Sequence, residues 1–242
     1  MTASSTPPGM RLVPAGYHVP FHSRGGGQAS RWVDAVWMDE RPVTNEEFLA
    51  FVREQPRWRR SRAAPEVVDA AYLSHWAGDL ELGPEAGPRQ PVTFVSWYAA
   101  RSYCQARDAR LPSEAEWEWA AMPAGPEEEA EIRERTFAFY GRPRQPLPDV
   151  GTSPPNRYGL RDQHGVFFEW VSDFQESQAA LQAPEEGGQA GDRKSDGWCG
   201  GSASSAGDVR NYAGFVRHAF RSSLQPRFTL HHLGFRCARS AF

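Results

Sequence analysis

Apolar residues recur with helical spacing in three stretches of the chain, and each stretch follows a residue suited to capping a helix. Thr44 and Glu47 have the spacing of a capping box, in which the hydroxyl and the carboxylate each accept from a backbone amide of the first turn. Ser113 and Glu116 repeat this pattern, and Ser96 precedes the third stretch. The predicted helices therefore begin after Thr44, span Trp97–Arg107, and begin after Ser113.

Shorter apolar segments predict strands near the start of the chain. The segment Met10–Val19 is expected to form a strand pair that turns at Pro14–Gly16, and Trp32–Met38 alternates well enough for another strand. Residues Pro123–Glu131 are rich in Pro and Glu, so a solvated segment is expected there. Beyond about residue 137 the pattern predicts only short strands and long loops, among them the polar stretch Gln175–Gly197.

These elements predict the α+β class. Residues 1–9 are expected to form a disordered tail, and residues 10–242 a single domain, because no internal repeat or linker interrupts them. A chain of 242 residues with 40% apolar residues can build one large core.

Charge and composition narrow the classes of function. The net charge of −3 argues against binding to nucleic acid or to an anionic membrane. No apolar run approaches the roughly 20 residues of a membrane span, and the first residues lack the pattern of a secretory signal. A cytoplasmic location is therefore expected. The three cysteines cannot form a disulfide scaffold.

Several runs together resemble the formylglycine-generating enzyme, or sulfatase-modifying factor, family, which also includes domains of ergothioneine-type sulfoxide synthases and pyoverdine-maturation proteins. The resemblance covers roughly residues 10–240 and implies a variant of the C-type lectin fold with little regular secondary structure. The runs that carry it are Arg41–Phe48, Pro91–Trp97, Arg110–Ala121, Asn156–Leu160, Gly165–Asp173, Gly200–Ser202 and Leu233–Cys237.

The resemblance does not extend to the family's copper chemistry. In the formylglycine-generating enzymes, two cysteines after the Gly-Gly-Ser motif bind copper(I), which prefers soft thiolates. Ser205 stands where the first of them is expected, and no cysteine occurs between residues 200 and 236. Ser202 matches the family's active-site serine. The sequence therefore predicts that formylglycine is not made by the two-cysteine mechanism.

Cys199 lies beside the position of the missing copper pair. One thiolate together with a histidine (His218, His231 or His232) would suit copper, zinc or iron. The alternative is that Cys199 is a small, half-buried residue and that His231 and His232 are a loop pair.

The resemblance also implies a calcium site and a disulfide pair. The matching calcium positions are Asp162, Gly165, Phe167 and Glu169, where carboxylate and carbonyl oxygens suit Ca²⁺. The alternative is a structural turn in which Glu169 caps backbone amides. Cys104 and Cys237 match the family's disulfide, although in a reducing cytosol they would remain two thiols in contact.

Residues around the Gly-Gly-Ser motif are predicted to line a substrate pocket for a peptide or an anionic small molecule. Two functions follow. The first is a divergent oxidoreductase-like enzyme or maturation factor acting on a protein or small metabolite, and the alternative is a non-catalytic binding module for a ligand or protein. Oligomeric state stays open. The predicted pocket residues are Trp198, Ser205, Tyr212 and Arg217.

Overall fold

The three capped helices are all present in the computed structural model, which describes residues 6–18, 30–140, 146–165, 167–174, 220 and 223–241. Helix α1 spans Asn45–Glu54, α2 spans Trp97–Ala106 and α3 spans Glu114–Ala120. Thr44 and Ser113 form complete capping boxes, and Ser96 accepts from the Ala99 amide. Local capping chemistry thus sets where each helix begins.

A fourth helix, which the sequence pattern did not predict, begins within Pro123–Glu131, and this segment is exposed or half-buried throughout, as expected of a solvated one. Helix α4 spans Pro126–Tyr140, and a short 3₁₀ helix, η1, spans Pro56–Trp58. Proline suits the first helical position because it lacks an amide hydrogen, and the glutamates at 127–129 face the positive end of the helix dipole. The proline and glutamates that led to the expectation of a solvated segment therefore also favour the start of a helix.

The strands at the start of the chain differ from the prediction in their partners. Strands β1 (Met10–Val13) and β2 (Gly16–His18) exist, but they do not pair with each other. The expected strand at Trp32–Met38 is divided into β3 (Arg31–Val33) and β4 (Val36–Asp39). Antiparallel pairing joins β1 to β4 and β2 to β3, so the chain changes sheet at each of the two breaks.

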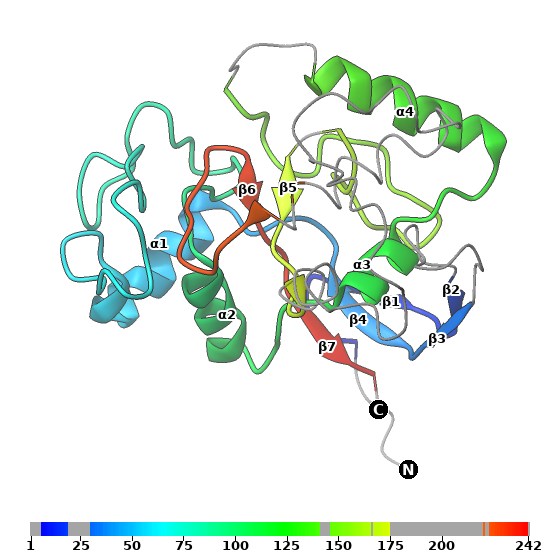
Figure 1. The fold of residues 1–242 in the computed structure, drawn as a ribbon, viewed down its shortest axis with the longest axis horizontal. Coiled ribbons are helices and arrows are strands. Elements are labelled where there is room, and N and C mark those ends of the chain that lie inside the picture. The colour runs from blue at the N-terminus through cyan, green and yellow to red at the C-terminus, as the bar shows by residue number, and fades with distance from the viewer. Residues whose placement is uncertain are drawn as a thin grey trace, which may run out of the picture.

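The C-terminal segment completes two sheets. Strand β7 (Ala238–Ser240) pairs antiparallel with β4, which gives the sheet order β1-β4-β7. Strand β6 (Leu233–Gly234) pairs in parallel with β5 (Phe168–Glu169). The Leu-Gly-Phe-Arg-Cys run therefore begins in β6 and leads directly to β7, so it connects the two sheets. The two ends of the described chain lie near each other (Figure 1).

Aromatic packing joins α1, α2 and the C-terminal run. The Phe48 ring lies 5.8 Å from that of Tyr103 and 6.1 Å from that of Phe235, measured between centroids. The Asp39 carboxylate accepts from the Cys237 amide at 2.9 Å and from Arg107 at 3.0 Å. The core is thus centred where the last strand returns to the first sheet.

Residues before β1 are partly ordered against the fold. Pro7 is buried, and the Gly9 carbonyl accepts from the Glu40 amide at 2.9 Å. Pro7 and Gly9 therefore contact the fold, although both lie in the range that was expected to form a disordered tail.

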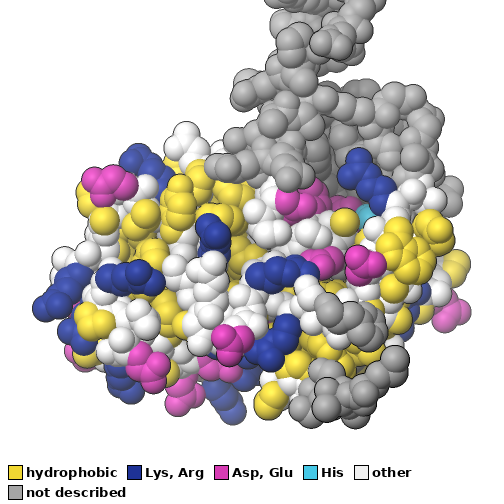
Figure 2. Space-filling model, turned by 90° about the horizontal axis from the view of Figure 1, so that it is seen from below, with side chains coloured by type: hydrophobic (Ala, Val, Ile, Leu, Met, Phe, Trp, Pro, Cys, Tyr) yellow, Lys and Arg dark blue, Asp and Glu magenta, His cyan; other side chains and the backbone are white. Residues whose placement is uncertain are grey.

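The outside of the molecule mixes both signs of charge. On the face seen in Figure 2, basic and acidic side chains are interspersed with apolar ones rather than gathered by sign. Within the described ranges, none of the helices is long and apolar enough to cross a membrane.

Candidate functional site

The predicted catalytic and pocket residues all fall outside the residues that the structure describes. This applies to the proposed metal or catalytic cysteine, the active-site serine and the four pocket residues, and their predicted roles stay predictions. They are Cys199, Ser202, Trp198, Ser205, Tyr212 and Arg217.

Cys104 and Cys237 form a disulfide in the structure, with their Cα atoms 5.5 Å apart. Both residues are fully buried, Cys104 on α2 and Cys237 directly before β7. Since the chain has three cysteines, this bond leaves Cys199 as its one free thiol.

Asp162, the first predicted calcium ligand, holds a turn of the backbone. Its φ of 60° lies in the left-handed region that Asp tolerates better than most residues. The buried carboxylate accepts from the amides of Gly151 and Ser153, the latter at 3.1 Å. In turn, the Asp162 amide donates to the Ser153 hydroxyl at 2.6 Å.

Glu169, the last predicted calcium ligand, forms a buried ion pair with Arg236. The guanidinium donates to both carboxylate oxygens, at 2.7 and 2.8 Å, and the Trp117 indole adds a third hydrogen bond at 3.0 Å. These donors occupy lone-pair directions of the carboxylate oxygens that a bound cation would also need. A dication placed against these oxygens would also lie close to the positive guanidinium.

The side chains of Asp162 and Glu169 therefore do not fit a shared calcium ion as they are placed. Gly165 and Phe167, whose predicted contribution is a backbone carbonyl each, are described between them. The calcium assignment rests on the resemblance alone and stays a prediction, while the Glu169 carboxylate meets the side chains of Arg236 and Trp117 rather than the backbone amides of the alternative.

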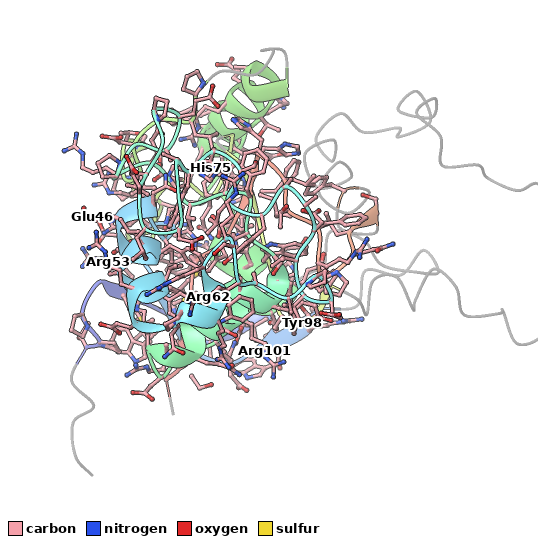
Figure 3. The ribbon with its side chains drawn as sticks, turned by 90° about the vertical axis from the view of Figure 1, so that its left-hand side faces the viewer. Glu46, Arg53, Arg62, His75, Tyr98 and Arg101 are labelled. Atoms are coloured by element: carbon pink, nitrogen blue, oxygen red, sulfur yellow. A yellow bond between two sulfur atoms is a disulfide. The ribbon has the colours of Figure 1, made fainter. Side chains whose placement is uncertain are left out.

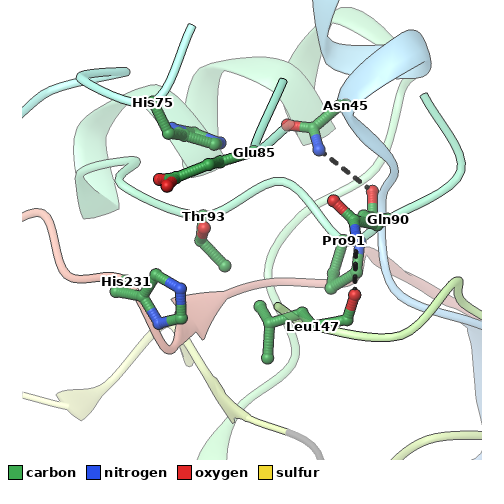
Figure 4. Close-up of a pocket in the computed structure, with 8 residues that line it drawn as sticks. All are labelled: Asn45, His75, Glu85, Gln90, Pro91, Thr93, Leu147 and His231. Carbon is green, nitrogen blue, oxygen red and sulfur yellow. Dashed lines mark hydrogen bonds between the residues drawn. The ribbon is translucent and has the colours of Figure 1, made fainter. Parts of the chain in front are cut away.

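A cavity between α1 and the loops on either side of it gathers polar side chains from distant parts of the sequence. Its volume is about 20 Å³, room for roughly one water-sized group, and it opens to solvent. Figure 4 shows His75, Glu85, Thr93 and His231 on one side of the cavity, and Asn45, Gln90, Pro91 and Leu147 on the other.

His75 is the most unusual side chain of this cavity. Both of its ring nitrogens are buried and have no hydrogen-bond partner among the described residues. Burial, with His231 and Arg60 nearby, lowers the pKa of His75 to about 4. The imidazole is therefore neutral at pH 7, with one nitrogen able to donate and the other able to accept. Figure 3 shows it apart from the exposed Arg53 and Arg62.

An aromatic ring separates the two histidines of the cavity. The Phe94 centroid lies 5.0 Å from that of His75 and 5.8 Å from that of His231. Phe94 has a φ of 52°, which is rare for a bulky residue and persists only where the surrounding structure imposes it. Its amide donates to Leu230 and its carbonyl accepts from Leu73, and these two bonds fix the strained residue.

The two predicted histidine ligands of the C-terminal loop point to different surroundings. His231 lines the cavity, whereas His232 packs against Phe168 and Phe220 with centroids 5.5 and 5.3 Å away. Burial also lowers the pKa of His232. Sequence reasoning singled out His231 but missed His75 and Glu85, which lie in loops without any periodic pattern.

The short strands, the peripheral helices and the central C-terminal run define a C-type-lectin-like domain of the formylglycine-generating-enzyme type. The chain belongs to the sulfatase-modifying factor family, because the family described as "Sulfatase-modifying factor enzyme 1-like domain" matches residues 1–241.

Individual relatives support this membership. The formylglycine-generating enzyme of Streptomyces coelicolor is 30% identical over an alignment covering 84% of this chain and 78% of that protein. The protein named inactive C-alpha-formylglycine-generating enzyme 2 of Mus musculus is 31% identical over 68% of this chain and 67% of its own. The serine/threonine-protein kinase pkn1 of Chlamydia pneumoniae is 30% identical over 58% of this chain, which spans 23% of that longer protein.

Solved structures agree on the fold. The structure of PvdO from Pseudomonas aeruginosa matches with a TM-score of 0.50 at 19% identity, covering 96% of this chain and 94% of that one. At this identity the likeness shows a shared fold.

Proposed function

We propose that this chain is a divergent member of the sulfatase-modifying factor family that acts on a protein or small metabolite as an oxidoreductase-like enzyme or maturation factor. It does not make formylglycine by the two-cysteine copper mechanism. The observation that carries the negative part is the number of free thiols, because the Cys104–Cys237 disulfide leaves Cys199 alone.

A single thiolate is not enough to hold copper in the way that the two-cysteine site does. Copper(I) is held best by soft sulfur ligands, and the oxygen of Ser205 is a poor replacement. Any redox metal at Cys199 would therefore need a second ligand of another type, with imidazole the best available choice. The predicted partners are His218, His231 and His232, of which His231 lines the described cavity.

A non-catalytic binding module is the second candidate. The relatives named as active and as inactive enzymes are equally similar to this chain, at 30% and 31% identity, so similarity alone does not favour catalysis. A cavity lined by polar side chains is consistent with a binding protein, which needs no pair of free thiols.

The experiment combines metal analysis with a turnover assay. Purified protein is reconstituted with copper(I), iron(II) or calcium, its metal content is measured, and it is incubated with oxygen and a cysteine-containing sulfatase peptide. The Streptomyces coelicolor enzyme serves as the positive control. We expect no formylglycine in the mass spectrum of the peptide; its formation by this chain would refute the negative part of the proposal.

Metal content distinguishes the two candidates. Stoichiometric copper or iron that is lost in Cys199→Ser supports the oxidoreductase-like enzyme and directs oxygen-uptake assays to small thiols. No redox metal in either protein favours the binding module. Bound calcium that is lost in Asp162→Ala would establish the calcium site despite the contacts described above.

A further inference from the structure

We propose that the cavity of His75, Glu85, Thr93 and His231 binds a primary ammonium group, with the Glu85 carboxylate supplying the charge and His75 and Thr93 supplying further acceptor atoms. This inference goes beyond the proposed function and does not depend on it, because it concerns ammonium binding and requires no metal at Cys199, although His231 is named in both.

Two of the polar lining residues are already satisfied and form a fixed wall. The Asn45 amide donates to the Gly87 carbonyl at 3.0 Å and accepts from the Trp76 indole at 3.1 Å. Gln90 accepts from the Gly87 amide at 2.8 Å and donates to the Leu147 carbonyl at 2.7 Å. A ligand therefore has to form its hydrogen bonds with residues on the opposite side of the cavity.

The opposite side carries hydrogen-bonding atoms that the described residues do not use. The two buried nitrogens of His75 have no partner among the described residues, and an unpaired buried polar atom is unfavourable. An occupant with N–H donors would satisfy the accepting nitrogen. Figure 4 shows the Glu85 carboxylate and the Thr93 hydroxyl on the same side as this ring.

The charge of the lining selects a cation rather than an anion. Glu85 is exposed and makes no ion pair with a described residue, and no Lys or Arg lines the cavity. The guanidinium of Arg60 lies outside this lining and donates to the Trp76 carbonyl at 3.0 Å, although its charge acts on His75 and opposes a cation beside that ring. An anion would face Glu85 without a lining cation to compensate for it.

Geometry favours an ammonium over a metal ion. The His and Glu side chains here do not form a three-ligand metal set among the described residues. An ammonium instead distributes N–H donors over separate acceptors at ordinary hydrogen-bond distances. Phe94 packs against both imidazoles but does not line the cavity, so it supports the rings rather than the ligand.

The remaining walls set the size of the ligand. The volume of about 20 Å³ admits an ammonium head and no more, so an attached aliphatic chain would lie at the opening of the cavity. A free small amine and the end of a lysine side chain share this chemistry.

The test is a titration of the full chain with propylammonium chloride at constant ionic strength, followed by ¹H–¹⁵N correlation of the histidine rings. We expect saturable shifts of the His75 and His231 signals. Glu85→Gln should weaken binding at least about tenfold, because a charge-assisted hydrogen bond contributes about 1.5–3 kcal/mol. Glu81→Gln is the matched control, since Glu81 is equally exposed in the same loop and does not line the cavity.

Two further ligands separate charge from hydrogen bonding. Tetramethylammonium carries the charge without N–H donors, and 1-propanol carries the chain without the charge, so both should bind at least tenfold more weakly. Equal binding of either, no saturable shift with propylammonium, or an unchanged affinity in Glu85→Gln would overturn the proposal. So would zinc shifting these signals while propylammonium does not.

A blocked lysine tripeptide distinguishes the sources. Tighter binding than propylammonium identifies a protein lysine as the occupant, whereas weaker binding identifies a free amine; both results require the Glu85 dependence.

Discussion

Glu169 and Arg236 form a residue-scale contact on which the middle of the fold depends. Their side chains are 1% and 0% exposed, and the guanidinium also donates to the Arg161 carbonyl at 2.8 Å. We predict that Glu169→Gln lowers the free energy of unfolding by about 3–5 kcal/mol, because it leaves a buried charge without its partner. Urea unfolding followed by tryptophan fluorescence measures this loss.

The exposed pair of Arg11 and Glu40 provides the comparison. Its side chains are 53% and 29% exposed, so Glu40→Gln should cost no more than about 1 kcal/mol. Equal losses in the two variants would show that burial does not set the strength of these pairs.

His75 makes a second residue-scale prediction, on pH. Its folded pKa of about 4 lies below the ordinary value of 6.5, so the unfolded chain binds the proton first as the pH falls. The stability that the neutral ring contributes is complete above about pH 6.5 and is lost towards pH 4. His231, Arg60 and Glu85 are the charged or titratable groups that face this ring or act on it.

We therefore expect the wild type to lose about 1–2 kcal/mol more stability than His75→Gln between pH 7 and pH 5. Urea titrations of both proteins at the two pH values measure the difference. Identical pH dependence would show that this ring does not titrate with the depressed pKa.

At the scale of elements, the capping boxes explain why the helices were predictable. In α3, the hydrogen bond from Arg110 and the Ser113 amide together outweigh burial, and the pKa of Glu116 is lowered. Arg41 and Thr44 do the same for Glu47 in α1. These contacts join residues at most six positions apart, and such short separations are readable in a sequence.

We predict that Thr44→Ala and Ser113→Ala each destabilise the protein by about 1 kcal/mol, because each removes the acceptor of an N-cap hydrogen bond. Ser102→Ala, inside α2, is the matched control and should change stability by less than about 0.5 kcal/mol. Thermal unfolding by circular dichroism measures all three. If Ser102→Ala lost as much stability as the two cap variants, the effect would come from removing a hydroxyl in general and not from the N-cap hydrogen bond.

Strand pairing was less predictable because it depends on contacts far apart in sequence. The turn at Pro14–Gly16 suggests a hairpin, yet Gly16 packs so closely on the Trp119 ring that a Cβ would lie 2.3 Å from it. The Trp119 indole also donates to the Pro14 carbonyl at 2.8 Å. These contacts with α3 hold β2 where it pairs with β3 instead of β1. The local pattern of residues 10–19 does not predict them.

The same distinction applies to the candidate site. Family motifs located Glu169 and the cysteine pair, but the role of Glu169 in the structure depends on Arg236, 67 positions away. The cavity brings Asn45 of α1 together with His75, Glu85 and His231 from separate loops; the sequence analysis singled out His231 for another role, and the other three read as ordinary polar residues in the sequence.

At the scale of the whole molecule, the disulfide closes the fold. It joins α2 to the segment before β7 across 133 positions, and β7 itself pairs with β4 near the other end of the chain. Disulfides persist mainly in oxidising compartments, and the cytoplasmic location expected from the sequence stays a prediction.

We predict that replacing both Cys104 and Cys237 by alanine lowers the free energy of unfolding by about 3–5 kcal/mol, because a loop of this length strongly restricts the unfolded chain. Cys199→Ser is the control and should leave stability within about 0.5 kcal/mol. Both sulfurs are buried, so a reductant should act on the native protein only as fast as it opens. Urea midpoints and thiol counts over time test the two statements together. Rapid reduction without loss of stability would mean that the bond is accessible and that packing around Phe48, Tyr103 and Phe235 closes the fold without it.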